Sequence, residues 1–161
     1  MIILGIDPGT ASTGYGVIGV IKKSKKLKCL EYGVIRTNNS STAAVRLTKI
    51  NSELNKLIKK YKPEAVSVER VYFFKNLKTI IPVSQAKGVI LFTAAKKKLP
   101  IYEFTPLQVK LIITGYGKSE KEIVQKKVKL LFKLKEIPKP DDAADALAVA
   151  ACCAKLFKKG A

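Results

Sequence analysis

The stretch MIILGIDPGTASTGYG, Met1–Gly16, sets the framework of the fold. It opens with a short apolar run over residues 1–6, which ends at Asp7–Gly9 with residue types that are typical of a tight turn. This pattern predicts a buried strand that breaks into a turn, with Asp7 at the end of the strand. Two β-rich segments follow at Gly14–Ile21 and Lys26–Thr37, and together with the first run they predict an antiparallel three-stranded meander.

The remainder of the chain alternates helical and extended patterns. Helices are expected over Thr42–Tyr61, Ile80–Lys98, Lys118–Phe132 and Ala143–Phe157, and strands over Ala65–Val71 and Pro100–Phe104. Three strands followed by alternating helix and strand predict an α/β fold with a mixed five-stranded sheet, its first three strands antiparallel and its helices on both faces. No segment is typical of a linker, so residues 1–161 are expected to form one domain.

The predicted helix Ile80–Lys98 is apolar on nearly every face, with Ile81, Val89 and Phe92 among its large side chains. Such a helix must be covered on more than one side. The pattern leaves two interpretations open, a central core helix and a helix that is covered by a second subunit.

Charge is the strongest compositional feature. The chain of 161 residues carries 31 basic and 12 acidic residues, for a net charge of +19, and only Arg36, Arg46 and Arg70 are arginines. Such an excess is typical of proteins that bind a polyanion, either nucleic acid or an anionic membrane surface, although a lysine-rich source composition would also produce it. Because lysine contacts phosphate as a point charge, we expect binding to the nucleic-acid backbone more than readout of bases.

The composition also excludes several classes of protein. The chain has no histidine, which excludes Ser-His-Asp and Cys-His catalysis and any His-ligated metal site. It has no apolar run long enough to span a membrane and no secretory signal pattern. Its three cysteines, two of them adjacent, do not suit a disulfide framework, so we expect a cytoplasmic protein with no membrane partner.

Four acids lie at positions that a structural role alone explains poorly. Asp7 and Glu69 each end an apolar strand, and Asp142 and Asp145 lie three residues apart on one face of the start of the last helix. Each has a structural alternative as a turn or helix cap, a favourable charge at a helix N-terminus, or the partner of a lysine. If the four converge, two of them about 4 Å apart repel by about 4 kcal/mol at moderate dielectric, so protons or cations must neutralise them.

Carboxylate ligands favour Mg²⁺ or Mn²⁺ over zinc. Two such ions about 4 Å apart can activate a water and stabilise the leaving oxygen of a phosphodiester. In a protein this basic, an acidic metal site indicates a metal-dependent nuclease.

The motifs around these acids resemble those of the RuvC family of bacterial Holliday-junction resolvases, in the ribonuclease H-like superfamily. The matching stretches are ILGIDPGT with TGYGVI, IRT, AVSVERVYFFKN, QAKGV, LPIYEFTPLQVK, GYGKSEK and DAADALA, and they run over nearly the full length. The resemblance implies a ribonuclease H-like fold. It also implies an Mg²⁺-dependent endodeoxyribonuclease that resolves four-way DNA junctions by paired symmetric nicks, in homologous recombination and DNA repair.

The resemblance extends to individual acids. Asp7, Glu69, Asp142 and Asp145 fall where the family keeps four catalytic, metal-binding acids, which implies up to two Mg²⁺ ions per subunit, with Mn²⁺ as a substitute. Asp141 is an additional acid beside them, so Asp141 with Asp145 stays open as an alternative pair.

DNA contacts are implied at three further positions. Tyr72 falls at the family's aromatic position, which stacks on bases near the opened junction centre, although Phe73 or Phe74 could take that role and Tyr72 could belong to the core. Lys110 and Lys121 match basic positions that contact phosphate near the cleaved bond, and the alternative for each is a solvated surface charge.

The resemblance implies a homodimer that meets along Ile80–Lys98 and works with the RuvA–RuvB branch-migration complex. Two departures from the family pattern stand out. Arg70 replaces the usual acid or glutamine beside Glu69, and Pro82 falls in the first turn of the predicted helix, where proline is tolerated.

Two rival functions stay open from the sequence. A RuvC-like nuclease that acts on ribosomal RNA precursors shares the aspartate at the strand end. A non-catalytic basic nucleic-acid-binding protein explains the charge but not the four acids.

Overall fold

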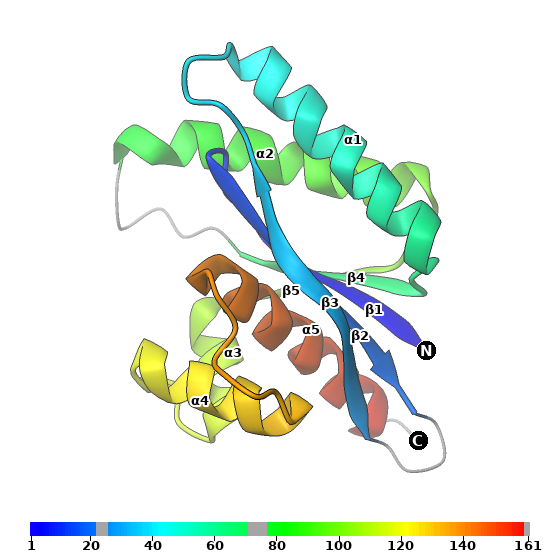
Figure 1. The fold of residues 1–161 in the computed structure, drawn as a ribbon, viewed down its shortest axis with the longest axis vertical. Coiled ribbons are helices and arrows are strands. Elements are labelled where there is room, and N and C mark those ends of the chain that lie inside the picture. The colour runs from blue at the N-terminus through cyan, green and yellow to red at the C-terminus, as the bar shows by residue number, and fades with distance from the viewer. Residues whose placement is uncertain (22–25, 71–76, 160–161) are drawn as a thin grey trace.

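The protein is an α/β structure in which helices cover both faces of one five-stranded sheet (Figure 1). The computed structural model describes residues 1–21, 26–70 and 77–159. The elements are β1 (Ile2–Asp7), β2 (Ser12–Val20), β3 (Leu27–Arg36), α1 (Ala43–Tyr61), β4 (Ala65–Glu69), α2 (Leu77–Lys96), β5 (Ile101–Phe104), α3 (Pro106–Thr114), α4 (Lys121–Phe132) and α5 (Asp141–Lys159).

The sheet has the strand order β3-β2-β1-β4-β5. β1 pairs antiparallel with β2, and β2 pairs antiparallel with β3, so the predicted meander is confirmed. β4 and β5 join on the other side of β1 as parallel strands. Because Ile6 of β1 is in register with Val68 of β4, the next residues, Asp7 and Glu69, leave neighbouring strands at the same edge of the sheet.

The helices form two layers, with α1 and α2 on one face of the sheet and α3, α4 and α5 on the other (Figure 1). Each layer closes its own hydrophobic core against the sheet. One core contains Leu54 of α1 and Ile90 of α2, and the other contains Leu147 of α5, all at most 2% exposed. No helix among the described residues is long and apolar enough to cross a membrane.

Helix α5 lies unusually close to the sheet because the strands beneath it carry glycine. A Cβ added to Gly5 of β1 would stand 2.2 Å from the carbonyl oxygen of Ala146, and one added to Gly14 of β2 would stand 2.0 Å from that of Asp142. The buried hydroxyl of Ser67 in β4 also donates a hydrogen bond to the Val149 carbonyl, at 2.8 Å. Small side chains on both elements thus bring the start of α5 down onto the ends of the central strands.

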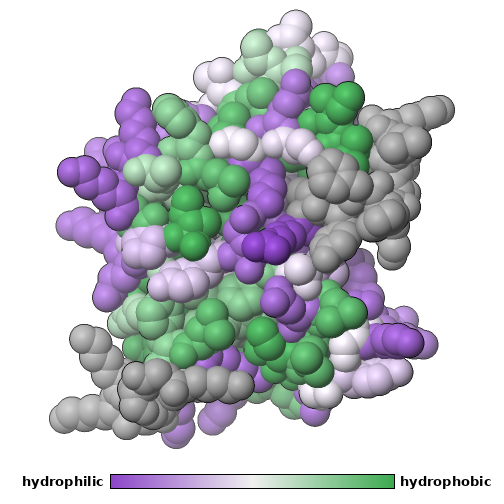
Figure 2. Space-filling model, turned by 180° about the vertical axis from the view of Figure 1, so that it is seen from behind, coloured by the Kyte–Doolittle hydropathy of each residue, from purple (hydrophilic) through white to green (hydrophobic). Residues whose placement is uncertain are grey.

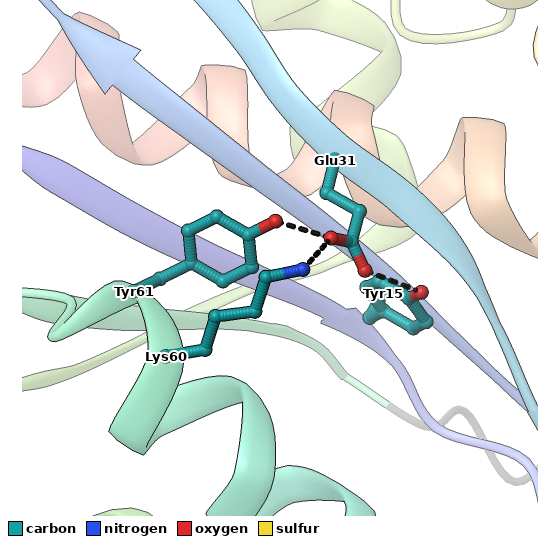
Figure 3. Close-up of polar contacts among 4 residues, drawn as sticks. All are labelled: Tyr15, Glu31, Lys60 and Tyr61. Atoms are coloured by element: carbon teal, nitrogen blue, oxygen red, sulfur yellow. Dashed lines mark hydrogen bonds and ion pairs between the residues drawn. The ribbon is translucent and has the colours of Figure 1, made fainter.

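A polar cluster joins α1 to β2 and β3 (Figure 3). The Glu31 carboxylate accepts hydrogen bonds from Tyr15 at 3.0 Å, from Lys60 at 2.5 Å and from the Tyr61 hydroxyl. The hydrogen bonds from Lys60 and then Tyr61 lower the pKa of Glu31. Burial, together with Glu31, raises the pKa of Tyr15 to about 12. The cluster therefore fixes the C-terminal end of α1 against the outer strands.

Helix α3 was not predicted from the sequence, although its start carries a recognisable signal. The Thr105 hydroxyl accepts the backbone N–H of Gln108 at 3.1 Å, and the Gln108 side chain accepts the N–H of Thr105 at 2.9 Å, which together form a capping box. Pro106 occupies the first helical position, and Gly115 ends the helix with a left-handed φ of 89°. The helix has only nine residues, too few for its periodicity to separate it from a loop.

Helix α2 differs from its prediction in two respects. It begins at Leu77, so Pro82 lies in the helix interior rather than in the first turn. One face of α2 is buried on the core, with Ala86 at 0% and Ile90 at 1% exposed, whereas Ile81 and Phe92 are 67% and 61% exposed. Seen from behind, apolar side chains are exposed in both halves of the molecule (Figure 2), and those of the upper half lie where α2 runs (Figure 1). This helix is thus partly a core helix and partly an apolar surface.

The close approach of α5 predicts a strong effect of one added methyl group. Gly5→Ala should lower the free energy of unfolding by about 1–3 kcal/mol or more, because the new Cβ meets backbone that cannot move without lifting α5. Gly19→Ala in β2 is the matched control, since its Cβ would meet only Leu30 side-chain atoms at 3.8–4.0 Å. Urea unfolding measures both, and equal stability of the two variants would contradict the prediction.

Candidate active site

The site begins with two acids on adjacent strands. The Asp7 and Glu69 carboxyls are hydrogen-bonding partners. Burial is the main reason that the pKa of Glu69 rises to about 7, and repulsion by Asp145 adds to it. Burial also raises the pKa of Asp7 well above its usual range. Without a cation, the pair therefore holds a proton to higher pH than two separate carboxyl groups would.

The first turns of α5 bring two more acids to the same place. After burial, the causes that raise the pKa of Asp7 are repulsion by Glu69, by Asp145 and by Asp142, in that order. Gly14 makes this possible, because the absence of a Cβ admits the backbone of Asp142 to the sheet. The structure therefore brings together all four acids singled out in the sequence, with Asp7 facing the other three.

Asp141 lies on the basic side of this group: it shares Lys121 with Asp145 and repels that carboxylate, but it is not among the acids that raise the pKa of Asp7. Its carboxylate lies 3.2 Å from the Lys139 ammonium and 3.5 Å from that of Lys121, and it is hydrogen-bonded by Gln125. The hydrogen bonds from Lys139 and then Gln125 lower its pKa. Of the two alternatives left by the sequence, the geometry places Asp142 with Asp7 and places Asp141 among cations.

Both lysines singled out in the sequence lie at the site. Lys121, the first residue of α4, places its ammonium 2.9 Å from the Asp145 carboxylate. Burial lowers the pKa of Lys121, but the hydrogen bond and attraction of Asp145 outweigh it, so that the net shift is upward. Lys110 of α3 lies close enough to Glu69 to stabilise the ionised carboxylate. The cluster is thus acidic at its centre and basic at its rim.

The four acids offer the kind of ligand atom that a divalent cation such as Mg²⁺ prefers. The ligands are all carboxylate oxygens, they lie in one half-buried group, and burial followed by mutual repulsion raises the pKa values of Asp7 and Glu69, while burial raises that of Asp145. As they stand, no three acidic or cysteine side chains of the described residues are arranged to hold one ion. In this arrangement a proton on the Asp7–Glu69 pair and the ammonium of Lys121 offset the negative charge.

Arg70, which was also singled out in the sequence, is not part of this group. Arg70 is 55% exposed and lies 4.0 Å from Glu103, so it points toward that carboxylate. The predicted stacking residues Tyr72, Phe73 and Phe74 lie outside the described residues.

Sequence reasoning missed one residue beside the site. Gln125 is 5% exposed and holds Asp141, but a buried glutamine in an amphipathic helix carries no pattern that marks it.

A sheet of this order, with acids at the ends of its two central strands and on the helix packed over them, defines a ribonuclease H-like nuclease. The family model of the crossover junction endodeoxyribonuclease RuvC matches residues 3–153. The chain therefore belongs to the RuvC family of crossover junction endodeoxyribonucleases.

Curated relatives and solved structures agree with this assignment. The RuvC of Petrotoga mobilis is 50% identical over 152 residues, which are 94% of this chain and 92% of the relative. The RuvC of Thermosipho melanesiensis is 51% identical over 96% of this chain and 97% of the relative. The Thermus thermophilus RuvC structure matches with a TM-score of 0.92 at 34% identity, over 99% of this chain and 97% of that one. The T. thermophilus RuvC in complex with a Holliday junction substrate matches over the same shares, with a TM-score of 0.89 at 32% identity.

The raised pKa of Glu69 predicts how stability depends on pH in the metal-free protein. A carboxyl whose pKa rises from 4.5 to about 7 on folding binds more protons in the folded state, so unfolding becomes easier as the pH rises through this range. Glu69→Gln should therefore make the melting temperature in EDTA less sensitive to pH between about 5 and 8.

Glu31→Gln is the control, because folding lowers the pKa of Glu31 whereas it raises that of Glu69. Because the pKa of Glu31 is lowered, its contribution to stability is present above its usual pKa and disappears in acid. The Glu31 variant should have a lower melting temperature from about pH 5 upward, should lose this difference in acid, and should keep the parent's slope between about pH 5 and 8. A parent melting temperature that rises steadily from pH 5 to 8, with the same slope in Glu69→Gln, would contradict the prediction.

Proposed function

We propose that this protein is a structure-selective endonuclease that resolves four-way DNA junctions by paired symmetric nicks, in recombination and repair. The observation that carries the proposal is the convergence of Asp7, Glu69, Asp142 and Asp145 at one edge of the sheet in a member of the RuvC family. The structural match to T. thermophilus RuvC in complex with a Holliday junction substrate supports junction DNA as the ligand. The net charge of +19 supports a polyanionic substrate.

We propose that the four acids hold up to two Mg²⁺ ions, with Mn²⁺ as a substitute. Ions bound there supply a water of lowered pKa and stabilise the charge on the leaving oxygen. Asp7 faces each of the other three acids, so its carboxylate would be shared by every ligand set that the group can form. The proton on the Asp7–Glu69 pair must leave for both carboxylates to bind cations, which ties metal affinity to pH.

The basic rim would orient the DNA. Lys110 and Lys121 stand beside Glu69 and Asp145, so a phosphate held by their ammonium groups lies directly over the acids. The pair with Asp145 keeps Lys121 at the site before DNA arrives. Tyr72, with Phe73 and Phe74 as alternatives, is proposed to stack on bases at the junction centre.

The exposed apolar face of α2 supports a homodimer. Ile81 and Phe92 are both largely exposed on this helix, and a second copy of the chain would cover them. Two sites related by a two-fold axis suit two symmetric nicks. We further propose that residues 1–161 act as one nuclease domain in the cytoplasm, together with a RuvA–RuvB branch-migration complex.

Neutralising single acids tests catalysis separately from binding. Asp7→Asn, Glu69→Gln, Asp142→Asn and Asp145→Asn should each reduce Mg²⁺-dependent junction cleavage by roughly 10²-fold or more, because each removes a charged oxygen ligand. Junction binding in EDTA should stay the same or tighten, since a carboxylate that repels phosphate is lost. Cleavage of a labelled four-way junction is measured beside a matched duplex and an RNA.

Asp141→Asn is the control, because Asp141 contacts Lys121 and Lys139 rather than Asp7. It should keep activity close to that of the parent. Full activity of Asp7→Asn would refute the metal-site proposal, and cleavage of RNA in preference to junctions would favour a role in ribosomal RNA processing.

A charge on the exposed face of α2 tests the dimer. Phe92→Glu should give a folded monomer, because Phe92 is 61% exposed in the single chain yet a buried unpaired charge would be costly in an interface. Leu130→Glu is the control, since Leu130 is 69% exposed but lies on α4. Light scattering measures the mass, and a Phe92→Glu variant that keeps the parent's dimeric mass would place the interface elsewhere.

A further inference from the structure

We propose that the cavity at the turn between β1 and β2 is a subsite for a backbone phosphodiester of the DNA strand, next to the acid cluster. The cavity has a volume of about 370 Å³. Its walls come from turn residues 9–12, from Arg46 of α1, and from Pro82 and Val83 of α2. The inference rests on the proposed function, because it assigns a second anchoring point to the same substrate.

The carbonyl oxygens of this turn are already occupied. The Thr13 hydroxyl donates to Gly9 O at 2.5 Å, and the Thr37 hydroxyl donates to Thr10 O at 2.6 Å. The Thr37 backbone N–H donates to Ala11 O at 3.1 Å. These contacts fix the turn and engage three of its carbonyls, so that the side-chain groups of the turn without a partner are hydroxyls, which can donate to an anion.

Two hydroxyl groups of the turn have no partner. Thr10 is only 7% exposed, and Thr10 Oγ1 and Ser12 Oγ are buried without a hydrogen bond to any described residue. A buried polar group without a partner reduces stability, and such groups in a native structure call for a ligand or another explanation. Both residues line the cavity, and a χ1 rotation that turns either hydroxyl into it would let a phosphate oxygen accept its hydrogen bond.

Arg46 adds a cation with a fixed orientation. Its Nε donates to the Thr37 hydroxyl at 2.9 Å, and its Nη2 donates to Asn39 Oδ1 at 3.3 Å. Within the described residues it pairs with no carboxylate, so the positive charge remains uncompensated. A guanidinium held in this way presents its remaining N–H groups as a planar fork, which is suited to phosphate.

The position of the cavity identifies the ligand. Gly9 in the cavity wall follows Asp7 by two residues, so the cavity lies at the end of β1 that carries the acids, whereas its α1 and α2 walls belong to the sheet face opposite α5 (Figure 1). A phosphate bound here would therefore be a neighbour of the reacting phosphate and not the reacting phosphate itself. The apolar surfaces of Pro82 and Val83 can contact the sugar beside it. A neighbouring phosphodiester of the same strand satisfies the unpartnered donors and the cation together.

Junction binding in EDTA, followed by fluorescence anisotropy over a series of salt concentrations, tests the subsite. Arg46→Gln should weaken binding by about tenfold and reduce the slope of log K against log salt by about 0.9, the value for one lost phosphate contact. Lys49→Gln, one turn further along α1, removes the same charge outside the cavity and should have a much smaller effect.

Thr10→Val separates a binding role from a structural one. Because the hydroxyl has no partner, its loss should leave the melting temperature unchanged or raise it, yet junction binding should weaken several-fold. Binding equal to that of the parent in both Thr10→Val and Ser12→Ala would overturn the proposal. So would equal losses in Arg46→Gln and Lys49→Gln.

Neutral methylphosphonate linkages, placed one at a time around the cleaved bond, locate the contact. At one position the parent should lose affinity and the penalty of Arg46→Gln should disappear, whereas no such position would overturn the subsite. Inorganic phosphate could instead stabilise the parent through Arg46 while no linkage position in the DNA has an effect. That result would indicate a site for free phosphate and would also overturn the proposed subsite. If the parent binds duplex and junction equally, the proposed function itself fails, whatever the variants do.

Discussion

The contact on which the structure depends most is the one between α5 and the two strands beneath it. Glycine at positions 5 and 14 lets the helix backbone touch the sheet. The alanines of α5 contribute to the close approach because their side chains are also small. Because this contact fixes the height and rotation of α5, it also fixes where Asp142 and Asp145 stand relative to Asp7. The same contact therefore determines both the packing of α5 and the positions of the acids. A larger side chain at the interface would lift the helix and separate the acids.

The site is a cluster of acidic side chains in a protein whose net charge is strongly positive. A chain with a net charge of +19 buries several of its few acids together, where burial and mutual repulsion raise the pKa values of Asp7, Glu69 and Asp145. Stability is given up locally to keep this group assembled, as is common where a protein binds cations or performs chemistry. Lysines at the rim offset part of the cost, and they also attract the phosphates of a polyanion.

Much of this arrangement could be predicted from residue patterns, because strand ends, periodicity and family motifs are local signals. The mixed sheet and the adjacency of Asp7 and Glu69 follow from them. Helix α3 carries a capping signal at Thr105 but is too short for a clear period, and the apolar period of α2 indicates a start at Ile80 rather than Leu77, which puts Pro82 in a first turn. The direction of Asp141 and the roles of Gln125 and Arg46 depend on packing between distant elements, which no local pattern records.

The acid set spans nearly the whole chain, from Asp7 in the first strand to Asp145 in the last helix. During synthesis the N-terminal strands emerge from the ribosome long before α5, and without that helix the glycine-bearing face of the sheet has nothing to cover it. A nascent chain shorter than 145 residues lacks at least one of the four carboxylates. If these four acids form the active site, as proposed, the site cannot be complete until α5 has packed on the sheet, so the last step of folding also assembles the catalytic group.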